Sequence, residues 1–319
     1  MSRLGVVLST ATEAPPKEFI QLGQLAEEKG FAAILVNEGR GDALACAEAI
    51  ALSTSRIKVG TNIANIYFRH PFLAAMTAAT IAELSDGRLV LGLGVSHRPL
   101  IESLGMKMEQ PRQYMRSYVQ TVKKALGGQP IGSFFRPRPA ARPVPVYVAA
   151  VTSESAEIGG ELAEGIMPFL PARSYLTRLV AAAKDAAQRA GRDPHAVDCI
   201  VSIPTFIADD LEQARSAARY NLAFFAQLPF YRKQWRRCGF VDEVNALQEA
   251  WKKNDRRAAA ALVSDRMVDE VCVFGPPGLC REQLAAFREA GAAMPVIAVS
   301  PVNEERLAAT RKALSLLAL

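Results

Sequence analysis

Along most of this chain, short apolar runs rich in β-branched residues alternate with longer stretches in which apolar positions recur every three or four residues. Runs of the first kind predict strands and stretches of the second kind predict helices. The strands are expected at Leu4–Leu8, Ala32–Val36, Ile57–Thr61, Leu89–Leu93, Val146–Ala150, Gly165–Phe169, Cys199–Ala208 and Pro295–Ser300. The helices are expected at Pro15–Lys29, Asp42–Ser53, Pro71–Leu84, Arg98–Leu104, Arg112–Leu126, Glu154–Leu162, Arg173–Ala190 and Gly278–Ala290.

Strands that alternate with helices in this way indicate a parallel sheet. Because the strands are apolar almost throughout, both faces of the sheet should be buried, and a closed (β/α)8 TIM barrel is the expected fold class. We expect one domain over residues 1–319, with insertions before strand 5 and before strand 8. An open doubly wound sheet is the alternative, but Ser9–Thr12 follows the first strand in place of a glycine-rich dinucleotide fingerprint. Pro204 should mark a bulge in the seventh strand or its end.

Composition narrows the classes of function. The chain is 50% hydrophobic and 22% charged, which gives enough apolar surface for a packed core and excludes a disordered protein. No apolar run is long enough to span a bilayer and no secretion signal opens the chain, so a soluble, cytoplasmic protein without a membrane partner is expected. The five cysteines form no C-x-x-C pair and only three histidines occur, so neither a disulfide framework nor a metal site is expected.

The charge balance is mildly basic. Lys+Arg is 38 and Asp+Glu is 32, a net charge of +6, which is too small an excess to predict a nucleic-acid partner. Basic residues concentrate at Arg136–Arg142 and Arg232–Arg237, and each cluster is either a solvated face or an anion-binding rim.

In a TIM barrel the site lies where the strands end. The residues that the predicted strands place there are Ser9, Thr10, Asn37, Glu38, Asn62–Asn65, Gly94–His97, Ala149–Ser153, Phe169 and Ser300.

Two neighbouring segments carry the strongest signal. They are Gly60–Pro71, GTNIANIYFRHP, and Glu83–His97, ELSDGRLVLGLGVSH. Together they resemble the patterns G-T-x-V, R-H-P and E-L-S-x-G-R-x-x-L-G-x-G of the bacterial luciferase-like superfamily of flavin- and deazaflavin-dependent oxidoreductases. The resemblance is strong over residues 30–125, weak over residues 210–275, and greatest to deazaflavin-dependent subfamilies of the methylenetetrahydromethanopterin reductase type. It implies a TIM barrel that binds its cofactor at the mouth.

The resemblance also implies which residues bind that cofactor. Family members have a non-prolyl cis peptide at the end of strand 3, here Asn62–Ile63, which bulges against the central ring of the cofactor. The loop that receives the cofactor phosphate would be Ala149–Ser153, at a helix N-terminus that favours anions, and Gly165 would complete the phosphate pocket. Relatives often have Gly-Gly where this chain has Val151 and Thr152, and a plain N-cap is the alternative role for Thr152 or Ser153. The full set of expected cofactor-binding residues is Asn37, Asn62, Ile63, Ala64, Gly94, Ser96, Ala149, Ala150, Val151, Thr152, Ser153 and Gly165.

Two residues are expected to transfer protons. His97 lies where glucose-6-phosphate-oxidising deazaflavin relatives carry a catalytic glutamate, and an unperturbed imidazole titrates near neutrality. Glu38 ends the second strand, where many deazaflavin relatives have Asp-His in place of Asn37-Glu38. The missing histidine argues against an alcohol or sugar substrate. The alternatives are a helix-start role for His97 and a salt bridge from Glu38 to Arg40 or another basic group.

The expected function is hydride transfer between the 8-hydroxy-5-deazaflavin coenzyme F-420 and a small organic substrate with a C=C, C=N or C=O bond. The basic loop Arg136–Arg142 would suit the acidic polyglutamate tail of this coenzyme. The alternatives are an FMN-dependent monooxygenase that uses reduced flavin and oxygen, and a non-catalytic relative. The alanine-rich stretches Ala43–Ala51 and Ala74–Ala82 fit the helix pairing of a homodimer, and buried core helices would have the same pattern.

Overall fold

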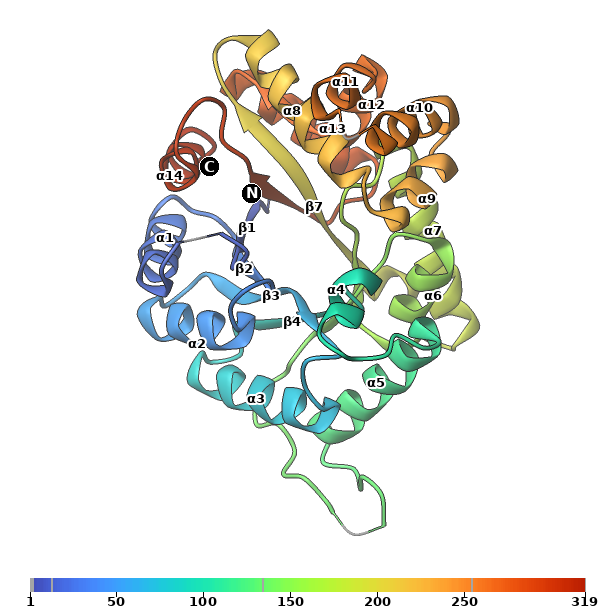
Figure 1. Cartoon of the computed structure of the whole chain (residues 1–319). Helices are drawn as coiled ribbons and strands as arrows, with labels where there is room; N and C mark the ends of the chain where they lie inside the picture. Colours follow the sequence, from blue (N-terminus) through green and yellow to red (C-terminus); the bar gives the residue numbers. More distant parts are fainter. Residues whose placement is uncertain (1–2, 13, 134, 254, 319) are drawn as a thin grey trace.

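The computed structural model describes residues 3–318 apart from 13, 134 and 254. Within these residues the strands are β1 (Gly5–Ser9), β2 (Ala33–Asn37), β3 (Lys58–Asn65), β4 (Leu89–Gly94), β5 (Val146–Ala149), β6 (Gly165–Met167), β7 (Asp198–Ile207), β8 (Val273–Gly275) and β9 (Met294–Val299). All of them except β8 form a closed ring of parallel strands, because β9 pairs with both β1 and β7, and β6 pairs with β7. The fold is the predicted (β/α)8 TIM barrel (Figure 1).

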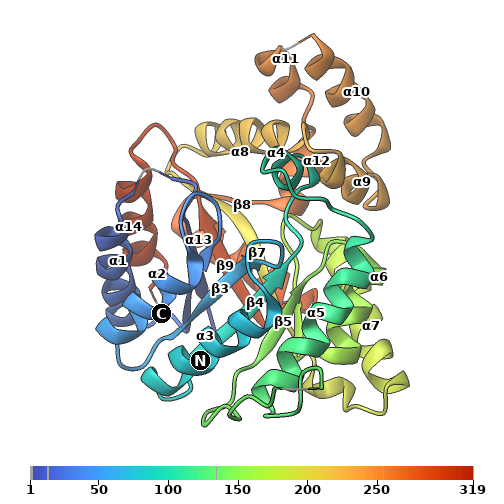
Figure 2. The ribbon, with the colours of Figure 1, turned by 60° about the horizontal axis from the view of Figure 1, so that its bottom comes forward.

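The helices surround this barrel (Figure 1). Those before β7 are α1 (Pro16–Glu28), α2 (Ala43–Ser53), α3 (Pro71–Leu84), α4 (Arg98–Ser103), α5 (Pro111–Leu126), α6 (Ser153–Leu162), α7 (Arg173–Arg189) and the 3-10 turn η1 (Pro194–Ala196). Those after β7 are α8 (Leu211–Phe225), α9 (Pro229–Arg237), α10 (Val241–Lys252), α11 (Arg256–Ala261), α12 (Asp265–Val271), α13 (Pro277–Glu289) and α14 (Arg306–Leu316). Helices α8–α12 form the insertion expected before the last barrel strand, and α10 and α11 stand away from the barrel (Figure 2).

Local sequence explains where the helices next to the site begin. The Asp42 carboxylate caps α2 by accepting hydrogen bonds from Leu44 N and Ala45 N. The His70 ring caps α3 by accepting from Phe72 N, and Pro71 fills the first helical position, where no N–H is needed. The R-H-P motif therefore fixes the joint between β3 and α3.

Two apolar layers stabilise the fold. The larger one fills the space between strands and helices, and a smaller cluster fills the inside of the barrel. The buried members of the inner cluster are Ala33, Leu35, Val90, Tyr147, Met167, Ile200, Met294 and Val296. This packed interior closes the barrel from below, so only the mouth at the carboxyl ends of the strands remains for a ligand.

The motif arginine Arg88 is part of this framework. Its guanidinium donates hydrogen bonds to the backbone oxygens of Ala51, Thr54, Ile57 and Ser85 at 2.7–3.0 Å. These oxygens lie at the end of α2, the start of β3 and the end of α3. Arg88 thus ties elements together at the opposite end of the barrel from the mouth.

One strand was missed and one prediction within a strand was wrong. No strand was predicted at β8, which has three residues and pairs with the end of β7. Pro204 neither bulges nor ends β7, which pairs with β9 in unbroken register from Ile200 to Thr205. The backbone N–H of Ser202 donates to Pro168 O, on the side of β7 that faces β6. The backbone nitrogen of Pro204, two residues later, points to the same side but lies beyond the end of β6. The missing N–H of Pro204 therefore removes no hydrogen bond between strands.

Among the described residues, no helix is both long enough and apolar enough to cross a membrane.

Candidate active site

The end of β3 forms the centre of the barrel mouth. The peptide bond between Asn62 and Ile63 is cis, at the position that the family resemblance indicates. The β3–β4 register shifts between Thr61 and Ala64, so the chain bulges there. The Thr61 hydroxyl fills the gap in the ladder, because it donates to Gly92 O at 2.7 Å and accepts from Gly92 N at 3.0 Å. Ile63 is half-buried at the top of the inner apolar cluster.

Gly94 and Ala149 leave space for Ile63. A β-carbon on Gly94 would lie 2.4 Å from Ile63 Cγ1 and 3.1 Å from Ala149 Cβ. The predicted cofactor-binding residues Ile63, Gly94 and Ala149, from three different strands, are therefore brought together. Asn62 extends across the barrel, where its Nδ2 donates to Ser202 Oγ on β7 at 2.7 Å.

His97 follows β4 and lies under α9. Its ring packs edge-to-face against Phe230 and Tyr231, with centroids 6.2 and 5.5 Å away. Burial lowers the pKa of His97 below its ordinary value, so the imidazole is neutral near pH 7. Its Nδ1 is buried and has no hydrogen-bond partner among the residues that the structure describes. This is a nitrogen for which a bound ligand could supply the partner.

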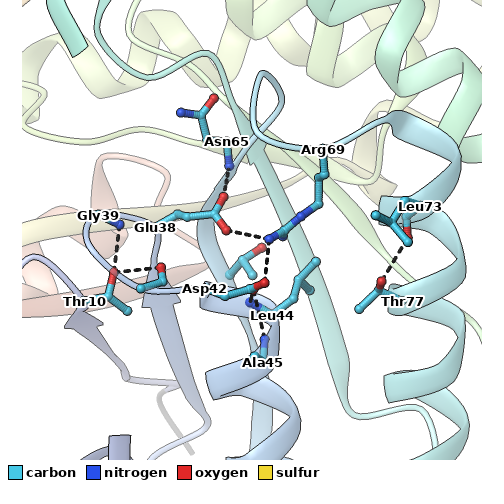
Figure 3. Close-up of polar contacts among 12 residues, drawn as sticks. Thr10, Glu38, Gly39, Asp42, Leu44, Ala45, Asn65, Arg69, Leu73 and Thr77 are labelled. Atoms are coloured by element: carbon cyan, nitrogen blue, oxygen red, sulfur yellow. Dashed lines mark hydrogen bonds and ion pairs between the residues drawn. The ribbon is translucent and has the colours of Figure 1, made fainter. Parts of the chain in front are cut away.

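Glu38 is almost fully buried and paired, with 3% of its side chain exposed. Its carboxylate accepts hydrogen bonds from Asn65 N at 2.6 Å and from Arg69 Nη2 at 2.9 Å (Figure 3). Arg69 Nη2 also lies 2.9 Å from Asp42 Oδ2. Burial raises the pKa of Glu38, and the Asn65 N–H and the Arg69 charge oppose that rise. The basic partner of Glu38 is thus Arg69 and not Arg40.

Three further predicted cofactor-binding residues lie beside these groups. Asn37 ends β2, and its buried Oδ1 accepts no hydrogen bond from the described part of the chain. Ala64 is buried and pairs with Leu93. Ser96 has a positive φ of 59° and turns the chain between β4 and His97. The unpartnered atom of Asn37 adds a second polar position at the mouth that a ligand could satisfy.

The predicted phosphate loop caps its own helix. Thr152 is the N-cap of α6, in a capping box with Ser155. The backbone N–H groups of Val151 and Thr152 both donate to Ser155 Oγ, at 3.2 and 3.1 Å. A phosphate could use these two donors only if the Ser155 side chain turned away. Ala150 is buried, and Ser153 begins α6 half-exposed.

Gly165 lies apart from this loop. It begins β6 next to Asp198, at the start of the strands, whereas Ala149 is the last residue of β5 and Ala150–Ser153 follow it. A β-carbon on Gly165 would lie 2.0 Å from Asp198 O, so close strand packing accounts for the glycine.

The basic loop Arg136–Arg142 does not reach the mouth, which corrects its expected role with the coenzyme tail. Arg138 pairs with Glu83 and Arg142 with Asp86, at the end of α3 and the turn into β4. The loop connects a helix to a strand, and such connections lie at the amino-terminal end of a barrel. The second basic cluster, Arg232–Arg237, lies in α9 at the mouth instead.

None of the predicted site residues lies in helix α9, although its basic cluster Arg232–Arg237 was weighed as an anion-binding rim. Gln234 Nε2 donates to Phe169 O and Trp235 Nε1 to Leu170 O, both after β6, while Arg237 pairs with Glu154 in the first turn of α6. Tyr231 packs against Phe169 and Phe225 as well as His97. The clustering of aromatic and basic residues in the segment PFYRKQWRR was the available signal. Its position over the mouth could not be inferred because the resemblance is weak there.

The mouth of this parallel barrel suits a cofactor-binding oxidoreductase. It combines a half-buried apolar bulge, a neutral histidine and buried polar atoms that a ligand could satisfy. Comparison with known proteins defines the class. The family model described as luciferase-like monooxygenase matches residues 2–294. The chain therefore belongs to the bacterial luciferase-like family of oxidoreductases.

Similar proteins cover most of the chain. An uncharacterized protein of Mycobacterium tuberculosis is 33% identical over 247 residues, which is 70% of this chain and 72% of that protein. The 5,10-methylenetetrahydromethanopterin reductase of Methanolobus tindarius is 26% identical over 92% of this chain and 93% of its own length. Among solved structures, the coenzyme F-420-dependent tetrahydromethanopterin reductase of Methanopyrus kandleri has a TM-score of 0.81 at 21% identity, and the match covers 99% of this chain and 98% of that one.

Proposed function

We propose that this chain transfers a hydride between coenzyme F-420 and a small organic substrate. The observation that carries the proposal is the bulge at Ile63 in the barrel mouth, where Gly94 leaves the space that the Ile63 side chain fills. A Mycobacterium tuberculosis protein described as a putative coenzyme F-420-dependent oxidoreductase is 24% identical over 95% of this chain, which supports the deazaflavin as the cofactor.

The residues at the mouth fit the ring of such a cofactor. Ile63 offers an apolar surface, and the unpartnered atoms Asn37 Oδ1 and His97 Nδ1 offer polar contacts. Val151 and Thr152 would hold the phosphate through their N–H groups once Ser155 releases them. When bound, the coenzyme supplies or accepts the hydride, and the protein orients the substrate and excludes water.

His97 is the proposed proton-transfer residue. Because burial keeps its ring neutral near pH 7, it can accept a proton from a substrate that loses a hydride. In the opposite direction the same ring, once protonated, returns the proton to the product. The rings of Phe230 and Tyr231 shield this position from solvent.

The FMN-dependent monooxygenase remains the second candidate. The position of Arg136–Arg142 favours it, since Arg138 and Arg142 pair with Glu83 and Asp86 at the end of the barrel opposite the mouth, where a bound acidic tail would not begin. The family description, luciferase-like monooxygenase, agrees with this alternative.

Anaerobic turnover separates the two candidates. Reduced F-420 is incubated under argon with the protein and a panel of carbonyl, imine and alkene compounds, and its oxidation is followed by absorbance. We expect substrate-dependent oxidation without oxygen, slowed about 10²–10⁴-fold in His97→Phe and unchanged in His195→Phe, which alters an exposed residue of η1. Turnover that needs both oxygen and reduced FMN would refute the proposal.

We also propose a homodimer through α2 and α3. Most alanines of these helices are buried in the chain's own core, so the alanine pattern does not support a dimer; the buried ones are Ala43, Ala47, Ala51, Ala74, Ala75, Ala78 and Ala82. The support comes from large exposed apolar side chains on the same helices, which are Leu52, Leu73, Met76 and Leu84. Sedimentation should give twice the mass of one chain, and Met76→Glu should give the monomer. A wild-type monomer would refute this part of the proposal.

A further inference from the structure

Glu38 is connected to the Ile63 bulge at two points. Its backbone N–H donates to Ile63 O at 3.2 Å, and its carboxylate accepts from Asn65 N at 2.6 Å. The two contacts are made by Ile63 and Asn65, the residues on either side of Ala64. The end of β2 therefore holds both ends of the segment that positions the Ile63 side chain.

The carboxylate is itself held in place. Arg69 Nη2 lies 2.9 Å from Glu38 Oε1 and 2.9 Å from Asp42 Oδ2, so one guanidinium bridges two acids (Figure 3). The Arg69 backbone oxygen accepts from the Tyr118 hydroxyl at 3.1 Å, which fixes Arg69 against α5. A buried carboxylate persists only when paired in this way. The side chains of Asp42 and Tyr118 thus hold Arg69, and Arg69 holds the Glu38 carboxylate in position.

This arrangement leaves Glu38 poorly suited to proton transfer. A general acid or base must come within hydrogen-bond distance of the reacting atom. Both carboxylate oxygens are already engaged, one by a backbone N–H and one by a cation, and only 3% of the side chain is exposed. A substrate could reach Glu38 only if the contacts that hold the bulge were broken.

We propose that Glu38 is a positioning residue, which holds Ile63 at the face of the cofactor ring while Arg69 anchors its carboxylate. The inference rests on the proposed function, because it takes Ile63 as the support of the cofactor ring. It replaces proton transfer as the role of Glu38 and leaves His97 as the proton-transfer residue.

The test compares Glu38→Ala, Glu38→Gln and the control Glu83→Gln, which removes one carboxylate at the other end of the barrel. Each is titrated with F-420 and with FMN, and the absorption spectrum of the bound cofactor is recorded. In Glu38→Ala we expect the affinity for the bound cofactor to fall about tenfold or more, with a changed spectrum. Glu38→Gln, whose amide oxygen can still accept from Asn65 N, should recover most of the affinity. Wild-type affinity and spectrum in Glu38→Ala would overturn the inference.

Amide hydrogen exchange tests the same inference without any cofactor. Exchange at Asn65 should be at least about tenfold faster in Glu38→Ala than in wild type and close to wild type in Glu38→Gln and Glu83→Gln. Unchanged exchange in Glu38→Ala would overturn the inference. If wild type binds neither cofactor, the proposed function fails and the exchange result still decides whether Glu38 holds the bulge. If Glu38→Ala does not fold, Glu38→Gln decides: near-wild-type affinity together with near-wild-type exchange at Asn65 supports the inference, and unchanged affinity despite faster exchange at Asn65 overturns it.

Discussion

Gly94 and Ile63 are complementary: a β-carbon on Gly94 would lie 2.4 Å from Ile63 Cγ1 and 2.6 Å from Ile63 Cδ1. These two nearest atoms belong to a flexible side chain, and the next neighbour, Ala149 Cβ, lies 3.1 Å away. The barrel can therefore accept a methyl group at position 94, but only if Ile63 moves. This makes position 94 a selective probe of the surface at the barrel mouth.

Gly94→Ala should consequently fold and bind cofactor poorly. Overpacking of this size costs about 1–3 kcal/mol of stability, and the displaced Ile63 should weaken cofactor binding about tenfold or more. The matched control is Gly278→Ala, which adds the same methyl group in α13 where no atom lies within 4 Å. Binding is measured by fluorescence quenching and stability by urea unfolding. Equal cofactor affinity in both variants would show that Ile63 does not contact the cofactor.

Arg88→Lys should destabilise the barrel and leave the mouth intact. A lysine cannot reproduce a guanidinium that donates to several backbone oxygens, so the free energy of unfolding should fall by about 2–4 kcal/mol. Arg138→Lys, which alters an exposed ion pair with Glu83, should change it by less than about 1 kcal/mol. Urea denaturation of the three proteins checks this. Similar unfolding of Arg88→Lys and wild type would contradict the structural role given to the motif arginine.

The low pKa of buried His97 predicts a particular pH dependence. Since the folded state disfavours the imidazolium, the stability that neutral His97 contributes is complete above about pH 6.5 and is lost as the pH falls below that value. His97→Phe should therefore lose less stability than wild type between about pH 6.5 and pH 5. Thermal unfolding across this range tests the difference, and NMR titration of the His97 ring gives its pKa directly. A ring that titrates at or above 6.5 would rule out the buried, neutral imidazole.

Glu27 supports the frame below the site. Its carboxylate accepts from the backbone N–H groups of Ser55, Arg56 and Ile57, and these hydrogen bonds hold the pKa of Glu27 at about 2. Because the folded pKa is depressed, this stabilisation is present above about pH 4.3 and is lost as the pH falls towards 2. After discounting for solvent exposure, Glu27→Gln should cost about 1 kcal/mol at pH 7. Glu28→Gln, at an exposed neighbour, is the control, and equal unfolding midpoints for the two variants would contradict the prediction.

The barrel could be predicted from the sequence because its strands are apolar runs separated by amphipathic helices. Pro71–Leu84 forms α3 with the predicted bounds, and the other predicted elements differ by a few residues at their ends. The bulge lengthens β3 to Asn65, which a count of apolar residues could not show. The strand β8 was missed because three residues carry no periodicity. The effect of Pro204 was misjudged because a missing N–H disturbs a sheet only where a neighbouring strand would have accepted its hydrogen bond, and the sequence does not show which strand that is.

The site was only partly predictable, because charge clusters carry no information on which end of the barrel they occupy. Arg136–Arg142 belongs to a helix-to-strand connection, and that topology places it away from the mouth. Arg69 and Arg88 lie in the two motifs, but their hydrogen-bond partners are distant in sequence and could not be inferred from spacing. Helix α9 lies in the segment of weakest resemblance, so its contacts with His97 and with the residues after β6 emerge only from the structure.

The most direct test of the proposed chemistry is a comparison of cofactor affinities. The purified chain is titrated with F-420 carrying its polyglutamate tail and, separately, with FMN, and binding is followed by fluorescence. We predict tight binding of F-420 and at least about tenfold weaker binding of FMN. Tighter binding of FMN would contradict deazaflavin-dependent hydride transfer and favour the monooxygenase. Binding of neither would contradict a cofactor site at the barrel mouth.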